Sequence, residues 1–119
     1  MIITGASAEG SQQAFQLSSQ WPQKLFATAG VHPHRASSYN AETDRLLREL
    51  AGQPNVVAIG ETGLDYYYDH SDREEQQRLF RIHIDVARET ALPVIIHTRD
   101  AEDDTLSILT DEMEKGSFP

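Results

Sequence analysis

The chain has 119 residues, 39% of them hydrophobic and 8% aromatic, which is the composition of one globular domain with a modest core. Its net charge of −9 excludes the basic surface that a non-enzymatic DNA- or RNA-binding module normally uses. The acidity counts less against an enzyme that binds divalent ions, because the ions supply positive charge locally. The chain has no cysteine and no apolar run of about 18 residues, so we expect no disulfide, no membrane span and a cytoplasmic location.

The first half of the chain predicts two strands, each followed by a helix. Met1–Gly5 and Lys24–Val31 are largely apolar runs of strand length. A helix from Ser7 to about Gln20 follows the first run, with Ser7 as its N-cap. A second helix begins after Asn40, carries an apolar stripe and ends at Gly52.

The second half repeats this alternation. Val56–Ile59 is a short apolar run that ends abruptly at Gly60, which predicts a strand buried on both faces. Ser71–Thr90 is the clearest helix, since its first residue and Glu74 have the spacing of a capping box. Pro93–His97 predicts a fourth strand, and a last amphipathic helix follows it.

Four successive βα units predict a parallel sheet with right-handed crossovers. Because an eight-stranded barrel contains eight such units, we predict an α/β fold in which residues 1–119 form a single partial TIM-barrel domain. The chain begins inside a predicted strand with nothing before it, so we expect a fragment or a truncated gene product.

Polar side chains gather where three of the four predicted strands end. Because the carboxyl ends of parallel strands share one edge of a sheet, we expect these side chains to lie together. Imidazole and carboxylate groups bind zinc, manganese or magnesium, and a bound ion can turn water into a nucleophile. The residues are His32 and His34 after the second strand, Glu61 and Asp65 after the third, and His97, Arg99 and Asp100 after the fourth.

Each of these residues also has a structural interpretation. The segment His32–His34 is compatible with a turn that carries two surface histidines, and Asp65 with a cap on a turn or helix. Asp100 has the position of an N-cap for the last helix, and Arg99 could pair with a neighbouring acid. The run Tyr66–Tyr68 is compatible with loop packing or with a surface on which a nucleic-acid base stacks.

Four sequence blocks resemble the TatD family of metal-dependent deoxyribonucleases. They are GVHPH at 30–34, VAIGETGLDY at 57–66, Glu75–Gln76 with Phe80, and PVIIHTRDA at 93–101. Their order and spacing match over essentially the whole chain. The resemblance implies a TIM-barrel, amidohydrolase-like hydrolase that cleaves DNA phosphodiester bonds with divalent metal, typically as an exonuclease.

The resemblance also implies roles for individual residues. Glu61 matches a bridging metal ligand and His97 a histidine ligand, so we expect these two to hold one or two divalent ions (Mg, Mn or Zn). His32 matches a histidine near the metal or the scissile phosphate. The resemblance thus leads us to predict His32, Asp65 and Arg99 as catalytic residues, and His34, Tyr66 and Asp100 as substrate-binding residues.

The chain departs from the family pattern at both ends. Family members begin with a strand that often carries an HxH metal pair, and continue to a histidine in an HCFSG-like block and an aspartate in an ETD-like block. We therefore expect the barrel's first strand and C-terminal half to be absent. Two alternatives stay open: a half-barrel that works only by association, which would cover its open sheet edges, or an amidohydrolase-fold enzyme for a small-molecule substrate.

Overall fold

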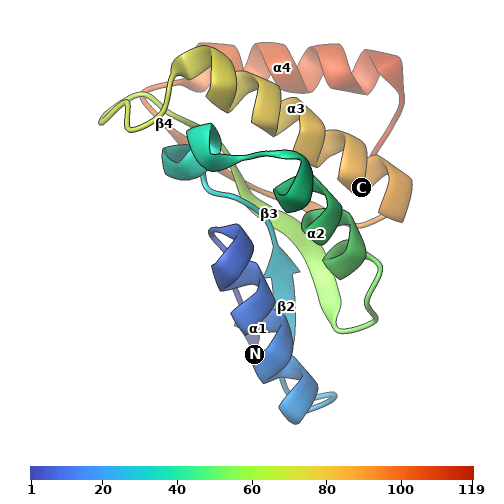
Figure 1. Cartoon of the computed structure of the whole chain (residues 1–119). Coiled ribbons are helices and arrows are strands. Elements are labelled where there is room, and N and C mark those ends of the chain that lie inside the picture. Colours follow the sequence, from blue (N-terminus) through green and yellow to red (C-terminus); the bar gives the residue numbers. More distant parts are fainter.

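The computed structural model describes all residues 1–119 as one parallel sheet whose strands alternate with helices (Figure 1). The strands pair in chain order, β1-β2-β3-β4, and every pairing is parallel. The predicted βα repeat is therefore confirmed. The elements are β1 (Ile2–Ile3), α1 (Ala8–Gln20), β2 (Phe26–Ala29), the 3-10 helix η1 (Pro33–Ser38), α2 (Ala41–Ala51), β3 (Val56–Asp65), α3 (Arg73–Thr90), β4 (Val94–Arg99) and α4 (Glu102–Lys115).

The main core lies between the central strands and the first three helices. Ala27 and Ala29 of β2 pair in register with Val56 and Ile59 of β3, and all four side chains are buried. Small alanines on β2 let α1 pack close to the sheet. Around Leu64, a second apolar cluster joins β3 to α3 and α4, which lie side by side in Figure 1. No helix has the length and apolar character needed to cross a membrane.

The N-termini of the first three α-helices follow the sequence with one correction. Ser7 and Asn40 cap α1 and α2 through their side chains, as predicted. The cap of α3 is Asp72, one residue later than the predicted Ser71. The Ser71 hydroxyl is used elsewhere, because it donates a hydrogen bond of 3.0 Å to the carbonyl of His34. This bond ties the start of α3 to η1.

Strand β3 does not end at Gly60, as the sequence predicted, but continues to Asp65. Beyond a register shift it pairs with β4, which itself extends past His97 to Arg99. Gly63 makes this pairing possible: its φ is +128°, and a Cβ at this position would lie 2.1 Å from the His97 carbonyl oxygen. Only glycine tolerates both the dihedral and the contact. Because the two strands are longer than predicted, Glu61 and His97 lie within hydrogen-bonded strands.

The first two strands are shorter than predicted. Where these strands end, side-chain hydroxyls take the place of the backbone hydrogen bonds between strands. The Gly5 N–H donates to the Thr28 hydroxyl, which in turn donates to the Gly60 carbonyl. The Ser11 hydroxyl bonds both the N–H and the carbonyl of Gly30. These buried bonds tie the carboxyl ends of β1 and β2 to Gly60, the residue of β3 that precedes Glu61.

Candidate active site

The carboxyl edge of the sheet brings together His32, Glu61 and His97. His32 follows β2, Glu61 lies within β3 and His97 within β4. His32 Nε2 lies 3.3 Å from Glu61 Oε1, and the centroids of the His32 and His97 rings are 4.7 Å apart. One ligand atom from each of the three side chains lies within 4.8 Å of the other two. Residues from three separate strands thus converge, as their positions in the sequence predicted.

The backbone of the segment after β1 holds two of these residues in place. The His32 N–H donates to the Ala6 carbonyl at 2.9 Å, and the Glu61 N–H donates to the Gly5 carbonyl at 3.1 Å. In both hydrogen bonds the donor and the acceptor lie far apart in the sequence. The segment Gly5–Ala6 therefore fixes the spacing between the two candidate ligands.

Asp65 lies fully buried beneath the cluster. Its Oδ2 accepts hydrogen bonds from His97 Nε2 at 2.9 Å and from the Arg99 guanidinium at 2.9 and 3.1 Å, while Oδ1 accepts from the Tyr67 N–H at 3.1 Å. His34 Nε2 is also 2.9 Å from Oδ2, but it is out of line for a hydrogen bond and is buried without a hydrogen-bond partner. One carboxylate thus binds two neighbouring side chains and one backbone N–H.

The electrostatics of the site favour a neutral His32 and an ionised Asp65. Burial alone would raise the pKa of Asp65, but the hydrogen bonds from Arg99 and His97 outweigh it and hold that pKa well below its usual range. Burial lowers the pKa of His32, and its neighbours His34 and His97 lower it further. His32 is therefore neutral near pH 7. In this form an imidazole has one nitrogen that can bind a metal or accept a hydrogen bond, and one N–H that donates a hydrogen bond.

Hydrogen bonds set the tautomers of the two histidines. His32 Nδ1 accepts from the His34 N–H at 3.1 Å, so the neutral ring carries its proton on Nε2, the atom that faces Glu61. His97 donates from Nε2 to Asp65, which leaves Nδ1 free to bind a cation. A carboxylate that orients a histidine from behind is the usual support of a histidine metal ligand.

A divalent ion fits this set of residues. In a tetrahedral site with metal–ligand bonds of about 2.1 Å, neighbouring ligand atoms are about 3.4 Å apart. His32 Nε2 and Glu61 Oε1 are 3.3 Å apart, close to that separation, but His32 Nε2 would join the ligands only in the other tautomer, with the ring proton on Nδ1. Imidazole nitrogen and carboxylate oxygen together suit several divalent ions, so the donor set alone does not select one.

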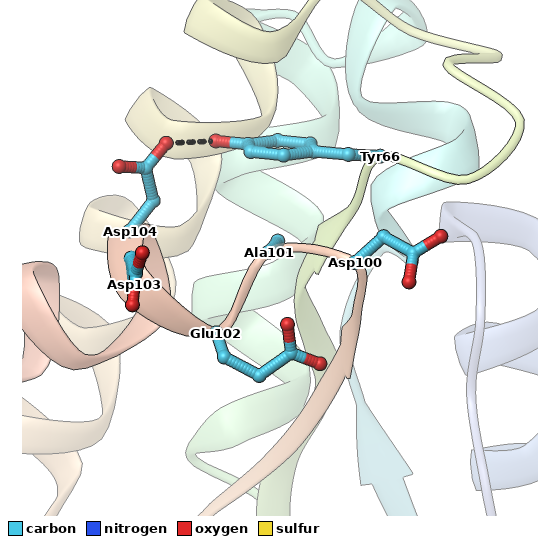
Figure 2. Close-up of a pocket in the computed structure, with 6 residues that line it drawn as sticks. All are labelled: Tyr66, Asp100, Ala101, Glu102, Asp103 and Asp104. Atoms are coloured by element: carbon cyan, nitrogen blue, oxygen red, sulfur yellow. Dashed lines mark hydrogen bonds between the residues drawn. The ribbon is translucent and has the colours of Figure 1, made fainter.

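Two predicted substrate-binding residues lie apart from the cluster. Tyr66 is 8% exposed, and its hydroxyl donates to Asp104 of α4 at 2.7 Å, as Figure 2 shows. Asp100 lines the same cavity of about 310 Å³, whose other charged residues, Glu102, Asp103 and Asp104, are all acidic. Such a lining disfavours a phosphate. The alternative role of Asp100 as the N-cap of α4 is wrong, because the cap is Ala101.

Sequence reasoning assigned no role at the site to two supporting residues on α3. Gln76 is buried, accepts from the Asp65 N–H at 2.8 Å and donates to the Asp65 carbonyl at 3.1 Å. His83 is buried, accepts from the Val31 N–H through Nε2 and contacts the Leu79 carbonyl through Nδ1, each at 2.9 Å. The signal was present, since the two residues are seven apart and share the buried face of α3.

The chain matches the family model described as TatD related DNase over residues 1–118. It is 48% identical over 109 residues to the "3'-5' ssDNA/RNA exonuclease TatD" of Erwinia tasmaniensis, a match that covers 92% of this chain and 42% of that protein. The protein of the same name from Dickeya dadantii is 43% identical over 115 residues, which are 97% of this chain and 44% of that one. The chain thus spans less than half the length of these relatives.

Solved structures agree with the sequence relatives. The TatD homologue YJJV of Escherichia coli aligns with a TM-score of 0.83 at 28% identity, covering 93% of this chain and 43% of that one. An uncharacterized amidohydrolase of Saccharomyces cerevisiae aligns with a TM-score of 0.73 at 29% identity, covering 91% and 39%. The four parallel strands with alternating helices correspond to part of the TIM barrel of these proteins. On the match of nearly its whole length, the chain belongs to the TatD-related DNase family.

Proposed function

We propose that this chain forms part of the active site of a metal-dependent exonuclease that hydrolyses DNA phosphodiester bonds. The observation that carries the proposal is the convergence of His32, Glu61 and His97 at the carboxyl edge of the sheet in a TatD-related chain. The names of the curated relatives support a single-stranded nucleic acid as the substrate.

In this proposal Glu61 and His97 Nδ1 hold one or two divalent ions, Mg, Mn or Zn. A bound ion supplies positive charge and lowers the pKa of water. Asp65 keeps His97 in the tautomer that leaves Nδ1 free, through the bond of 2.9 Å to Nε2. The His32 Nε2–H would donate a hydrogen bond to a phosphate oxygen, and the Arg99 guanidinium would add positive charge near it. We also assign His34, whose ring centroid is 4.4 Å from that of His32, to substrate binding.

The test compares the complete protein with its Glu61→Gln variant on labelled single-stranded DNA, in magnesium or manganese, with and without chelator. We expect chelator-sensitive degradation by the wild type and its loss in the variant, together with weaker metal binding in calorimetry. Glu114→Gln is the matched control, since Glu114 is an exposed carboxylate of α4. Unchanged activity in Glu61→Gln would refute the proposal. Hydrolysis of a small ester without DNA cleavage would favour the small-molecule alternative.

A second candidate is a half-barrel that persists by association. β1 and β4 are the edge strands of the sheet, and Ile2 and Ile96 on them are 56% and 37% exposed. Unpaired strand edges with exposed apolar side chains favour pairing with a second copy or a complementary fragment. Light scattering on the 119-residue chain tests this, and a monodisperse monomer would contradict it.

A further inference from the structure

An exposed group of aromatic rings follows β3. Tyr67 and Tyr68 are 59% and 54% exposed, although large aromatic side chains usually bury most of their surface. Their ring centroids are 4.5 Å apart, and Tyr68 stacks on the ring of His70 at 5.1 Å. We refer to Tyr67, Tyr68 and His70 as the tyrosine platform.

The platform is continuous with the candidate active site. The ring of His34 is 4.7 Å from that of His70 and 6.0 Å from that of Tyr68, measured between centroids. The same ring is 4.4 Å from that of His32. Only the ring of His34 therefore separates the platform from His32 of the candidate metal site. A strand bound at that site would reach the platform.

The platform is also held in place before anything binds. The Arg99 guanidinium lies 5.1 Å from the Tyr67 centroid and 4.8 Å from the Tyr68 centroid, over the ring faces. Arg99 is itself paired with buried Asp65 at 2.9 Å, and the Tyr67 N–H donates to the same carboxylate. Rings that are already ordered lose little conformational freedom when a ligand stacks on them.

We propose that the tyrosine platform stacks against an unpaired base near the end of a single-stranded nucleic acid whose phosphate lies at the candidate site. This inference rests on the proposed function and names its substrate-selecting residues. With a net charge of −9 the chain has little positive surface to attract a phosphate backbone, and base stacking supplies affinity without it. Bases inside a duplex are already stacked, so the platform selects single strands.

Binding is measured by fluorescence anisotropy with the complete protein in magnesium. The probe is a short fluorescein-labelled oligothymidylate with phosphorothioate linkages, which keep the strand intact. We expect the double variant Tyr67→Ala/Tyr68→Ala to bind about 5- to 150-fold more weakly, the range of base–aromatic stacking. The variant Tyr67→Phe/Tyr68→Phe keeps the rings and should bind as the wild type does. Trp21→Ala removes a ring that is 55% exposed at the far end of α1, and it should change nothing.

A second strand that lacks its terminal base separates stacking from other effects. We expect the wild type to bind this abasic strand more weakly by a similar factor, and the double alanine variant to bind both strands alike. Equal binding of the two strands by the wild type, or wild-type affinity in the alanine variant, would overturn the proposal. If the platform behaves as expected but the wild type leaves ordinary DNA intact in magnesium and manganese, only the proposed exonuclease function fails.

Discussion

The buried histidine on α3 makes the structure sensitive to mild acid. His83 is fully buried, its Nε2 accepts from the Val31 N–H, and its Nδ1 donates to the Leu79 carbonyl. Only the neutral ring can do both. Protonation would place a charge in the core and set a ring N–H against the Val31 N–H. Because Val31 precedes His32, the same event would release the segment that carries a candidate active-site residue.

The size of the effect follows from the pKa. Burial lowers the pKa of His83 from 6.5 to about 4, so between these two values the unfolded chain binds a proton that the folded chain does not. The stabilisation from the neutral ring is therefore complete above pH 6.5 and is lost as the pH falls through about 4. At 1.36 kcal/mol for each pH unit, the loss is about 3 kcal/mol.

Urea unfolding followed by circular dichroism at a series of pH values measures this loss. The comparison is with His83→Phe, which keeps a buried ring but cannot titrate. The variant should be less stable near pH 7 by about 1–3 kcal/mol, because the Val31 N–H loses its acceptor. Its free energy of unfolding should also fall less steeply below pH 6.5 than that of the wild type. Parallel curves for the two proteins would refute the assignment of a neutral, hydrogen-bonded His83.

Three further substitutions test the site and its supports. Gly63→Ala should destabilise the fold by about 3 kcal/mol or more in urea unfolding, because its Cβ would lie 2.1 Å from the His97 carbonyl oxygen; near-wild-type stability would contradict the β3–β4 register. Ser11→Ala should lower the free energy of unfolding by about 1–3 kcal/mol in the same assay, since it removes the hydroxyl that bonds both the N–H and the carbonyl of Gly30. A loss below the error of the assay would count against these bonds. Asp65→Asn should lower metal affinity about 10- to 100-fold in calorimetry by weakening the support of His97, whereas unchanged affinity would exclude Asp65 from that role.

The sequence predicts the architecture well because its signals are local. Apolar runs such as Val56–Ile59 and caps such as Asn40 depend on neighbouring residues alone, and both lie where they were expected. The end of β3 is different. Whether the chain leaves the sheet at Gly60 depends on pairing with β4, which lies more than 30 residues away in the sequence. The glycine by itself does not predict this pairing. The cap of α3 was missed for the same reason, since Ser71 has a partner in η1.

The same division applies to the candidate site. That His32, Glu61 and His97 share an edge follows from the order of parallel strands, so the sequence was sufficient to group them. The sequence does not predict which residue supports the others, because this depends on buried contacts between residues far apart in the chain. Asp65 was predicted as a catalytic residue, with a cap on a turn or helix as the alternative.

In the structure Asp65 is a shared anchor of the candidate metal site and the tyrosine platform. It bonds His97 on the metal side, and Arg99 and the Tyr67 N–H on the platform side. A ligand that shifts Arg99 would therefore also disturb the carboxylate that orients His97. If the two surfaces act on one strand, Asp65→Asn should weaken both base stacking and metal binding, whereas loss of the tyrosine rings should weaken stacking alone.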